Sequence, residues 1–388
     1  TYPAPIAWGA TFDPDLVRRM AAAIGSDMAA VGVHQGLAPV LDVVRDYRWG
    51  RVEECIGEDP YLVATMGTAY VEGIQSAGVI ATLKHFAGYS ASKGARNHAP
   101  VSIGVRELND VILPPFEMAV RLGRAGSVMN SYADLDGIPA AAHGYLLTAV
   151  LRRLWGFEGT VVSDYWAVPF LDLMHRVTPD RASSGAVALC AGIDIELPET
   201  DAFARLADLV ESGTLEEAIV DRAAGRVLRQ KIELGMLDPD WSAVPSPDAG
   251  GGVDLDSPHN QGLARVLAEE SIVLLSNDGV LPLSSPRRAV AVVGPCASDP
   301  RTMLGCYSFA NHVLAHYPGA GLGIEVPTLI DALRAELPEA AIEHATGVPI
   351  REVDRSGLPA AVSLAESCDV CVVAVGDVAG LFGAGTSG

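Results

Sequence analysis

Charged and aromatic side chains directly follow three short apolar runs of the sequence, in the triplets at 84–86, 130–132 and 163–165. Short apolar runs rich in β-branched residues are typical of buried strands in a parallel sheet. The carboxyl ends of such strands form the ligand-binding face of α/β barrels and open α/β sheets, so we expect these side chains to lie close together. A carboxylate beside a cation, an imidazole and aromatic rings suits nucleophilic chemistry on a polar ligand.

Asp164 is the acidic residue at the end of the third run. The helix-like segment 146–154 leads into Gly156, which can close a helix, and the run Thr-Val-Val at 160–162 follows. A carboxylate at the end of a buried strand is either an active-site group or the N-cap of the next helix. The local pattern alone leaves both interpretations open.

Helical and strand-like segments alternate through the first 236 residues, after an irregular apolar stretch at 1–12. We expect helices at 13–31, 61–77, 106–124 with a break at Pro114-Pro115, 146–154, 183–191 and 203–234, and strands at 35–40, 79–83, 127–129, 160–162 and 194–197. This alternation predicts a parallel sheet, and the polar strand ends favour a (β/α)8 TIM-type barrel that is incomplete at its N-terminus.

A stretch rich in Pro and Gly interrupts the alternation and predicts three parts: a catalytic barrel domain at 1–236, a linker at 237–260, and an α/β sandwich domain with a mainly parallel open sheet at 261–388. The second domain has expected strands at 289–293, 341–344 and 370–375. Its glycine-rich segment 319–323 lacks the strand before and helix after that a nucleotide loop requires, so no cofactor is predicted. Cys368 and Cys371 have C-x-x-C spacing without a second ligand pair, so no metal site is predicted.

The composition limits the partners. The chain has 388 residues with 48 acidic and 27 basic side chains, a net charge of −21, which argues against nucleic acid. No apolar run has the length of about 20 residues that a membrane span requires. The chain starts at Thr1 and stops at Gly388 in mid-pattern, so we interpret it as truncated at both ends. Its localisation is therefore unknown, with the cytoplasm slightly favoured over secretion, and a homo-oligomer stays open.

Five motifs in order resemble glycoside hydrolase family three. They are Ala-Pro-Val-Leu-Asp at 38–42, the run 48–60 containing Arg-Trp-Gly-Arg and Gly-Glu-Asp-Pro, Lys-His-Phe at 84–86, Met-Asn-Ser-Tyr at 129–132, and Val-Ser-Asp-Tyr at 162–165. Gly-Asp at 376–377 and the segments 380–382 and 385–388 resemble the second domain of the family. The resemblance implies a TIM-type barrel followed by an α/β sandwich, with a sugar bound between them.

The resemblance implies a retaining exo-acting β-glycosidase that hydrolyses terminal β-D-glucosyl or β-D-xylosyl residues through a covalent glycosyl-enzyme on Asp164. The residues expected to bind the β-glycoside or oligosaccharide substrate are Arg51, Lys84, His85, His98, Tyr132 and Tyr165. Four of them also have a structural interpretation: Arg51 as a partner of Glu54 or Glu58, His98 as a surface histidine, and Lys84 and His85 as purely structural residues. Trp49 and Trp166 are expected to be packing residues, and Glu196 a wall residue.

Two departures from the family pattern matter. The acid/base glutamate of this branch follows Gly-Thr-Ser-Gly, the residues at 385–388 where the chain stops, so we assign the acid/base to no residue of this chain. The loop 89–98 lacks the Asp of the Asp-x-His pair found in the β-N-acetylhexosaminidase branch, which argues against an amino-sugar substrate. Two further functional classes stay open: a barrel lyase that forms a Schiff base on Lys84, and a non-catalytic sugar-binding module.

Overall fold

The computed structural model describes residues 1–243, 252–283, 288–317 and 319–380. The chain forms two compact units, one made of Thr1–Tyr47 with Cys55–Ile272 and the other of Arg48–Glu54 with Val273–Gly388. Part of the predicted linker and the segment 381–388, including the Gly-Thr-Ser-Gly motif, lie outside the described residues. The domain bounds 1–236 and 261–388 remain a proposal. Helix α10 (Pro258–Glu270) groups with the first unit, where its Asn260 donates a hydrogen bond to Asp27 at 2.9 Å.

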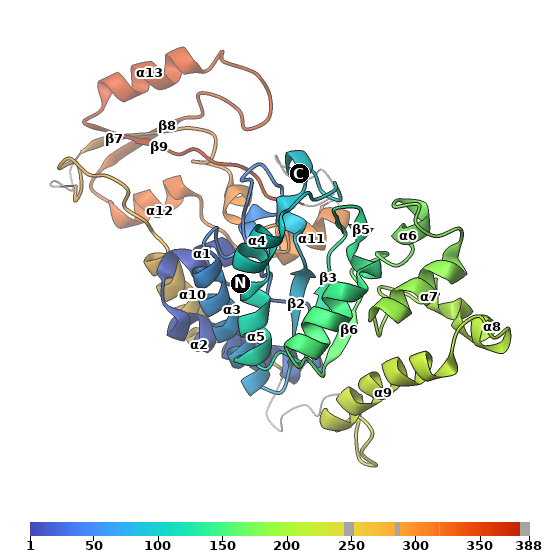
Figure 1. Ribbon diagram of the computed structural model, residues 1–388. Helices are drawn as coiled ribbons and strands as arrows, with labels where there is room; N and C mark the ends of the chain where they lie inside the picture. The colour runs from blue at the N-terminus through green and yellow to red at the C-terminus, as the bar shows by residue number, and fades with distance from the viewer. Residues whose placement is uncertain (244–251, 284–287, 318, 381–388) are drawn as a thin grey trace. The chain divides into compact units, whose positions relative to one another are not determined.

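A parallel sheet lies at the centre of the first unit, with strand order β1-β2-β3-β6. The strands are β1 (Gln35–Gly36), β2 (Ile80–Phe86), β3 (Ser127–Asn130) and β6 (Thr160–Val162). The register pairs Val128 with Leu83 on one side and with Val161 on the other. The carboxyl ends of β2, β3 and β6 therefore lie at one edge of the sheet, as the polar triplets predicted (Figure 1).

The predicted strands at both edges of this sheet are shorter than expected. The strand predicted at 35–40 is regular only over β1, with one further bridge between Val40 and Lys84. Pro39 has no N–H to donate to a ladder, which explains the break. The strand predicted at 194–197 is reduced to a bridge between Ile195 and Val162, and Pro198 follows at once.

The helices of the first unit begin where capping residues predict. Asp13 accepts from the backbone N–H groups of the first turn of α2 (Pro14–Ala30), and Asp59 does the same for α3 (Pro60–Ser76). The two helices pack so closely that a Cβ on Gly73 would lie 2.3 Å from the Arg18 carbonyl oxygen. Figure 1 shows α3 and α5 (Pro114–Arg121) running beside β2.

The N-terminal stretch predicted to be irregular contains a helix, α1 (Pro5–Thr11). Trp8 in this helix is buried and stacks on Tyr70 of α3, with ring centroids 5.0 Å apart. Tertiary packing thus determines a helix that the short local pattern did not indicate.

The short element η1 (Val52–Glu54) belongs to the second unit. The remaining elements of the first unit are η2 (Tyr89–Ala91), η3 (Lys93–Ala95), α4 (Val105–Glu107), η4 (Leu108–Ile112), β4 (Asp134–Leu135), β5 (Ile138–Pro139), η5 (Ala140–Ala142), η6 (Tyr145–Leu154), α6 (Phe170–Leu173), α7 (Arg181–Ala191), η7 (Phe203–Arg205), α8 (Leu206–Glu211) and α9 (Glu217–Glu233). The segment η6 is a π-helix at the place where an ordinary helix was predicted.

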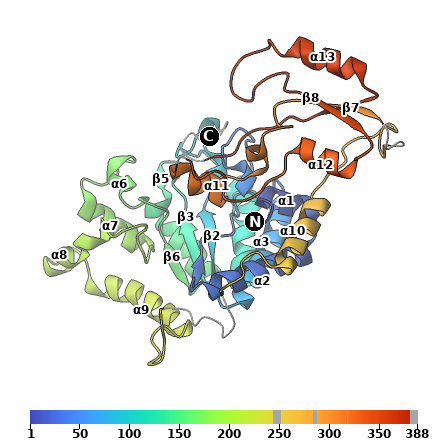
Figure 2. The same cartoon turned by 180° about the vertical axis from the view of Figure 1, so that it is seen from behind.

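The second unit has its own parallel sheet with strand order β8-β7-β9. Its strands are β7 (Ala289–Val293), β8 (Ala341–Ala345) and β9 (Val370–Val373), and its helical segments are η8 (Pro300–Met303), α11 (Phe309–His312), η9 (Leu314–His316), α12 (Leu329–Glu336) and α13 (Leu358–Ser367). Figure 2 shows α12 and α13 on opposite sides of the sheet. Alternate residues of β7 supply the two cores: Val290 and Val292 pack with Ile330 of α12, and Ala291 and Val293 pack with Ala361 of α13.

The segment Arg48–Glu54 is held to the second unit through Cys306. The backbone N–H of Cys306 donates to Glu53 at 2.8 Å, and its thiol donates to Glu54 at 3.3 Å. Burial, reinforced by the charges of Glu54 and Glu53, raises the pKa of the Cys306 thiol, so this thiol stays protonated and acts as a donor.

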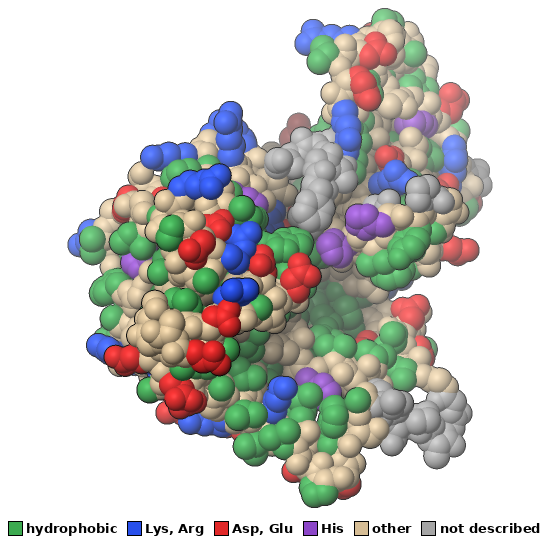
Figure 3. Space-filling view, turned by 90° about the vertical axis from the view of Figure 1, so that its right-hand side faces the viewer, with side chains coloured by type: hydrophobic (Ala, Val, Ile, Leu, Met, Phe, Trp, Pro, Cys, Tyr) green, Lys and Arg blue, Asp and Glu red, His purple; other side chains and the backbone are tan. Residues whose placement is uncertain are grey.

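Surface charge is mixed on the face shown in Figure 3, where acidic and basic side chains are interspersed. Among the described residues, no helix combines the length and the apolar character needed to cross a membrane.

A buried carboxylate links the middle of β6 to two helices. Asp194 accepts from Arg152 of η6 at 2.5 Å, from Arg226 of α9 at 2.7 Å, and from the backbone N–H of Val161 at 2.8 Å. Burial lowers the pKa of Arg152 to about 10, and the charge of Asp194 opposes that shift. The guanidinium therefore remains charged at neutral pH.

We predict that Asp194→Ala lowers the free energy of unfolding by about 3–5 kcal/mol, because it leaves two guanidinium groups without their shared carboxylate. Asp208→Ala is the matched control, since Asp208 pairs with Arg205 where both side chains are more than 60% exposed; its expected loss is below about 1 kcal/mol. Denaturant unfolding measures both. Equal losses would contradict the structural role of Asp194.

Candidate active site

The backbone of Asp164 is fixed at the carboxyl end of β6. Asp164 donates its N–H to the side-chain oxygen of Asn130, at the end of β3, over 3.3 Å. One carboxylate oxygen of Asp164 accepts from the N–H of Tyr165 at 2.8 Å. Asp164 is 7% exposed, so its carboxylate lies in a largely dry environment. The helix-cap interpretation does not fit, because the next helix, α6, has Pro169 as its N-cap.

His85 links two carboxylates at this edge of the sheet. Its Nδ1 lies 2.8 Å from Oδ2 of Asp42, and its backbone N–H donates to the same oxygen at 3.0 Å. Its Nε2 lies 3.8 Å from Oδ2 of Asp164. The side chains of His85 and Asp42 are 2% and 1% exposed. A cation between two buried carboxylates offsets part of the cost of burying them.

Lys84 lies beside this array on β2 and is 8% exposed. Its main chain bonds to the 39–41 segment, donating to the Pro39 carbonyl at 3.1 Å and accepting from the Leu41 N–H at 2.6 Å. The pairing of β2 with β3 shifts register between Leu83 and Phe86, and the Lys84–His85 and Phe86–Ala87 peptide bonds are cis. A lysine side chain is seldom buried to this extent unless polar groups surround it. The burial of Lys84 at the strand end therefore fits a polar binding site.

Aromatic rings pack against one another next to His85. The edge of Tyr89 meets the His85 ring at a centroid distance of 5.0 Å, and Tyr132 lies 5.7 Å from Tyr89. His98 packs on Tyr132 at 4.4 Å, and Phe170 lies 5.7 Å from both. His98 is half-buried, so the structure places it against a predicted site residue and not on the open surface.

His175 fixes the main chain of this aromatic cluster, with its Nε2 3.1 Å from the Tyr132 carbonyl oxygen. Burial lowers the pKa of His175, while Asp134 and this hydrogen bond act in the opposite direction. The neutral ring donates its Nε2–H to the carbonyl.

Tyr165 and Trp166, which follow Asp164, are exposed. They are 40% and 43% exposed, and their rings meet edge to face at 5.9 Å. Trp166 was expected to be a packing residue, and this expectation was wrong: its φ of 61° is left-handed and its ring is not in the core. Trp49 is 1% exposed and does pack in the core.

Arg51 makes the structural pair that was weighed against its role in binding. Its Nε and one terminal nitrogen donate to the two carboxylate oxygens of Glu54 at 2.6 and 2.8 Å. Arg51 is 6% exposed and its guanidinium lies 5.9 Å from the ring centroid of Tyr307. Such a bidentate pair fixes the plane of the guanidinium. The pair lies in the second unit, with Cys306.

Ligand atoms of Glu53, Glu54 and Cys306 lie within 4.8 Å of one another, the spacing of a metal site. The hydrogen bonds already described engage all three, and a metal ion would need the Cys306 thiolate. Because these hydrogen bonds already engage the ligand atoms, the donor set fits a hydrogen-bonded cluster.

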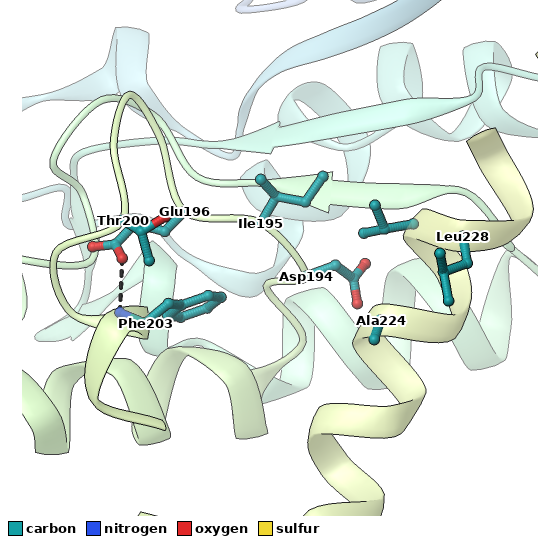
Figure 4. Close-up of a pocket in the computed structure, with 8 residues that line it drawn as sticks. Asp194, Ile195, Glu196, Thr200, Phe203, Ala224 and Leu228 are labelled. Carbon is teal, nitrogen blue, oxygen red and sulfur yellow. Dashed lines mark hydrogen bonds between the residues drawn. The ribbon is translucent and has the colours of Figure 1, made fainter. Parts of the chain in front are cut away.

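A pocket of about 390 Å³ is lined by Asp194, Glu196, Phe203 and Leu228 (Figure 4). Its two carboxylates are engaged in structural bonds. Asp194 binds two arginines, and Glu196 accepts from the backbone N–H groups of residues 201, 202 and 203 at 2.8–3.0 Å. Glu196 is thus a wall residue that shapes a turn.

Sequence reasoning missed Asp42 and Asn130 as members of this site. Both lie in motifs that carried the family resemblance, but neither was given a role. The signal that could have found them was their position: each is a polar residue directly after a strand-like run, as Asp164 is. The contact between Asp42 and His85 joins residues 43 positions apart, which no local pattern reveals.

Comparison with known families and proteins agrees with this geometry. Residues 1–230 match the glycosyl hydrolase family 3 N-terminal domain, and residues 272–386 match the glycosyl hydrolase family 3 C-terminal domain. These matches confirm the predicted fold class, a TIM-barrel-type domain followed by an α/β sandwich with a parallel sheet.

Three similar proteins illustrate the relationship. A β-xylosidase from Formosa agariphila is 35% identical over 97% of this chain and 53% of its own length. A β-glucosidase from Rhizobium radiobacter is 35% identical over 89% of this chain and 39% of its own length. The crystal structure of a β-glucosidase from Listeria innocua in complex with glucose superposes with a TM-score of 0.82 at 29% identity, over 97% of this chain and 50% of that one.

The chain spans about half the length, or less, of these relatives. Within that span the match runs through both units, and it includes the strand ends that carry Lys84, His85 and Asp164. The chain belongs to glycosyl hydrolase family 3.

Proposed function

We propose that the protein is a retaining exo-acting β-glycosidase that hydrolyses terminal non-reducing β-D-glucosyl or β-D-xylosyl residues. The observation that carries this proposal is the buried carboxylate of Asp164, fixed at the end of β6 with His85 Nε2 3.8 Å away. The names of the relatives, β-xylosidase and β-glucosidase, support both sugars as candidates.

Asp164 is the nucleophile in this proposal. Its carboxylate oxygen bonds to the anomeric carbon as the glycosidic C–O bond breaks, and a separate carboxylic acid protonates the departing oxygen. Water then hydrolyses the glycosyl-enzyme, the second carboxyl group now accepting the proton from water. That second group lies about 5–5.5 Å from the nucleophile in retaining enzymes, and we assign it to no described residue of this chain.

The proposed nucleophile must be ionised before it attacks. Burial of Asp164 opposes ionisation, while nearby positive charge favours it. His85, with its Nε2 3.8 Å from Oδ2 of Asp164, can supply this charge, and so can Lys84, which precedes it on the same strand end.

The proposed sugar contacts follow from the chemistry of the side chains. Lys84 and His85 donate hydrogen bonds to sugar hydroxyls in this proposal. Arg51, in the second unit, remains a proposed sugar-binding residue whose guanidinium plane is fixed by Glu54. Tyr132, Tyr165 and His98 offer flat faces to the apolar face of a sugar.

We predict that Asp164→Asn lowers kcat by at least about a thousandfold while the protein stays folded, because the substitution removes the nucleophilic charge and keeps the shape. The matched control is Asp172→Asn in α6, which breaks a pair with Arg181 and should leave kcat near that of the wild type. Nitrophenyl β-glycoside kinetics and thermal unfolding measure the two effects. Wild-type kcat in Asp164→Asn would refute the assignment.

The variant Asp164→Gly tests the stereochemistry of attack. Azide can occupy the space left by the carboxylate and attack from the same face, which inverts the anomeric centre. We predict partial recovery of activity with azide and an α-glycosyl azide product, identified by NMR. A β-glycosyl azide would overturn the nucleophile role.

We predict that Lys84→Met lowers kcat/KM by more than about tenfold, since a hydrogen bond from a charged donor contributes about 1.5–3 kcal/mol. Lys93→Met, in the exposed part of the next loop, is the matched control and should behave as the wild type. Wild-type kinetics in Lys84→Met would exclude a sugar contact, and borohydride trapping of a carbonyl substrate on Lys84 would favour a lyase instead.

A further inference from the structure

Asp42 makes two hydrogen bonds to one residue of the proposed active site. Its Oδ2 accepts from Nδ1 of His85 at 2.8 Å and from the His85 backbone N–H at 3.0 Å. Both side chains are almost fully buried. Two bonds from one oxygen fix both the position of the His85 main chain and the rotation of its ring.

The carboxylate of Asp42 determines which nitrogen of the His85 ring carries a proton. An ionised carboxylate accepts only, so Nδ1 of His85 must carry hydrogen. The other nitrogen, Nε2, then faces Oδ2 of Asp164 at 3.8 Å. A lone pair at Nε2 would face a second carboxylate, whereas an N–H there is attracted to it. The two buried carboxylates therefore favour the doubly protonated, positively charged ring.

Other groups around His85 also affect whether its ring is protonated. Lys84, its neighbour on β2, opposes a second positive charge, and the edge of Tyr89 from η2 packs against the ring at 5.0 Å without a charge of its own at neutral pH. Asp42 comes from the segment after Val40, and Asp164 from the end of β6. Asp42 is a direct partner of the ring, since its Oδ2 lies 2.8 Å from Nδ1 of His85.

We propose that Asp42 is a positioning residue for the reaction: it orients His85 and keeps it protonated, so that an Nε2–H donor and its positive charge stay beside the nucleophile. This inference rests on the proposed function. The role of Asp42 explains why the positive charge of His85 persists through the reaction. Asp164 loses its negative charge when it becomes an ester, but Asp42 remains ionised and still holds the His85 proton. His85 transfers no proton in this scheme.

The test compares the full-length wild type with Asp42→Asn and Asp42→Ala. Asparagine can keep an acceptor oxygen at the same place without the charge, and alanine removes both. Glu196→Gln is the matched control, since it neutralises another buried strand-end carboxylate outside the proposed site. The readouts are kcat and KM against pH for a nitrophenyl β-glycoside, and the imidazole 15N shifts of histidine-labelled protein, with His85→Asn assigning the signal.

We expect both His85 nitrogens to be protonated at neutral pH in the wild type. In Asp42→Asn the midpoint of the His85 titration should fall by about one pH unit or more. Because the active form is protonated, activity is lost as pH rises through that midpoint, so the alkaline limb of kcat/KM should move to lower pH in parallel. At pH 7, kcat/KM should fall at least about tenfold, and further in Asp42→Ala, which also frees the ring.

The proposal is overturned if Asp42→Asn keeps the wild-type pH profile and His85 shifts, or if it only unfolds more easily, as Glu196→Gln is expected to do. Failure of the proposed function is a separate result. A wild type that hydrolyses no nitrophenyl β-glycoside would sink the glycosidase assignment, while the 15N titrations would still decide whether Asp42 holds the His85 proton.

Discussion

The proposed site depends on the burial of two carboxylates around one imidazole. Asp42 and Asp164 are 2% and 7% exposed, and an isolated buried carboxylate carries a large desolvation cost. His85 lies between them, bonded to Asp42 and 3.8 Å from Asp164. Each group lowers the cost of burying the others.

The rest of the first unit brings the three groups together. Parallel pairing of β2, β3 and β6 aligns their carboxyl ends, and Asn130 binds the backbone of Asp164 across that edge. At the middle of β6, Asp194 accepts from Val161 and links the strand to η6 and α9. The bonds that hold β6 in place therefore lie close to the strand end that carries the proposed nucleophile.

Sequence patterns predicted the elements that repeat and missed the contacts that do not. The strands at 160–162 and 289–293 were predicted to the residue, because β-branched runs bounded by polar residues have few competing conformations. The convergence of His85 and Asp164 followed from their strand-end positions. The role of Asp42, the α1 helix and the exposure of Trp166 depend on long-range packing or on a left-handed φ, which local periodicity does not encode.

The most direct measurement is the capture of the covalent intermediate. Incubation of the full-length protein with a 2-fluoro β-glycoside slows both chemical steps and lets the glycosyl-enzyme accumulate. Peptide mapping by mass spectrometry then locates the sugar. A single 2-fluoroglycosyl group on the carboxylate of Asp164 is the predicted result. A label on another carboxylate, or catalytic turnover of β-glycosides by a protein that never carries a label, would contradict Asp164 as the nucleophile.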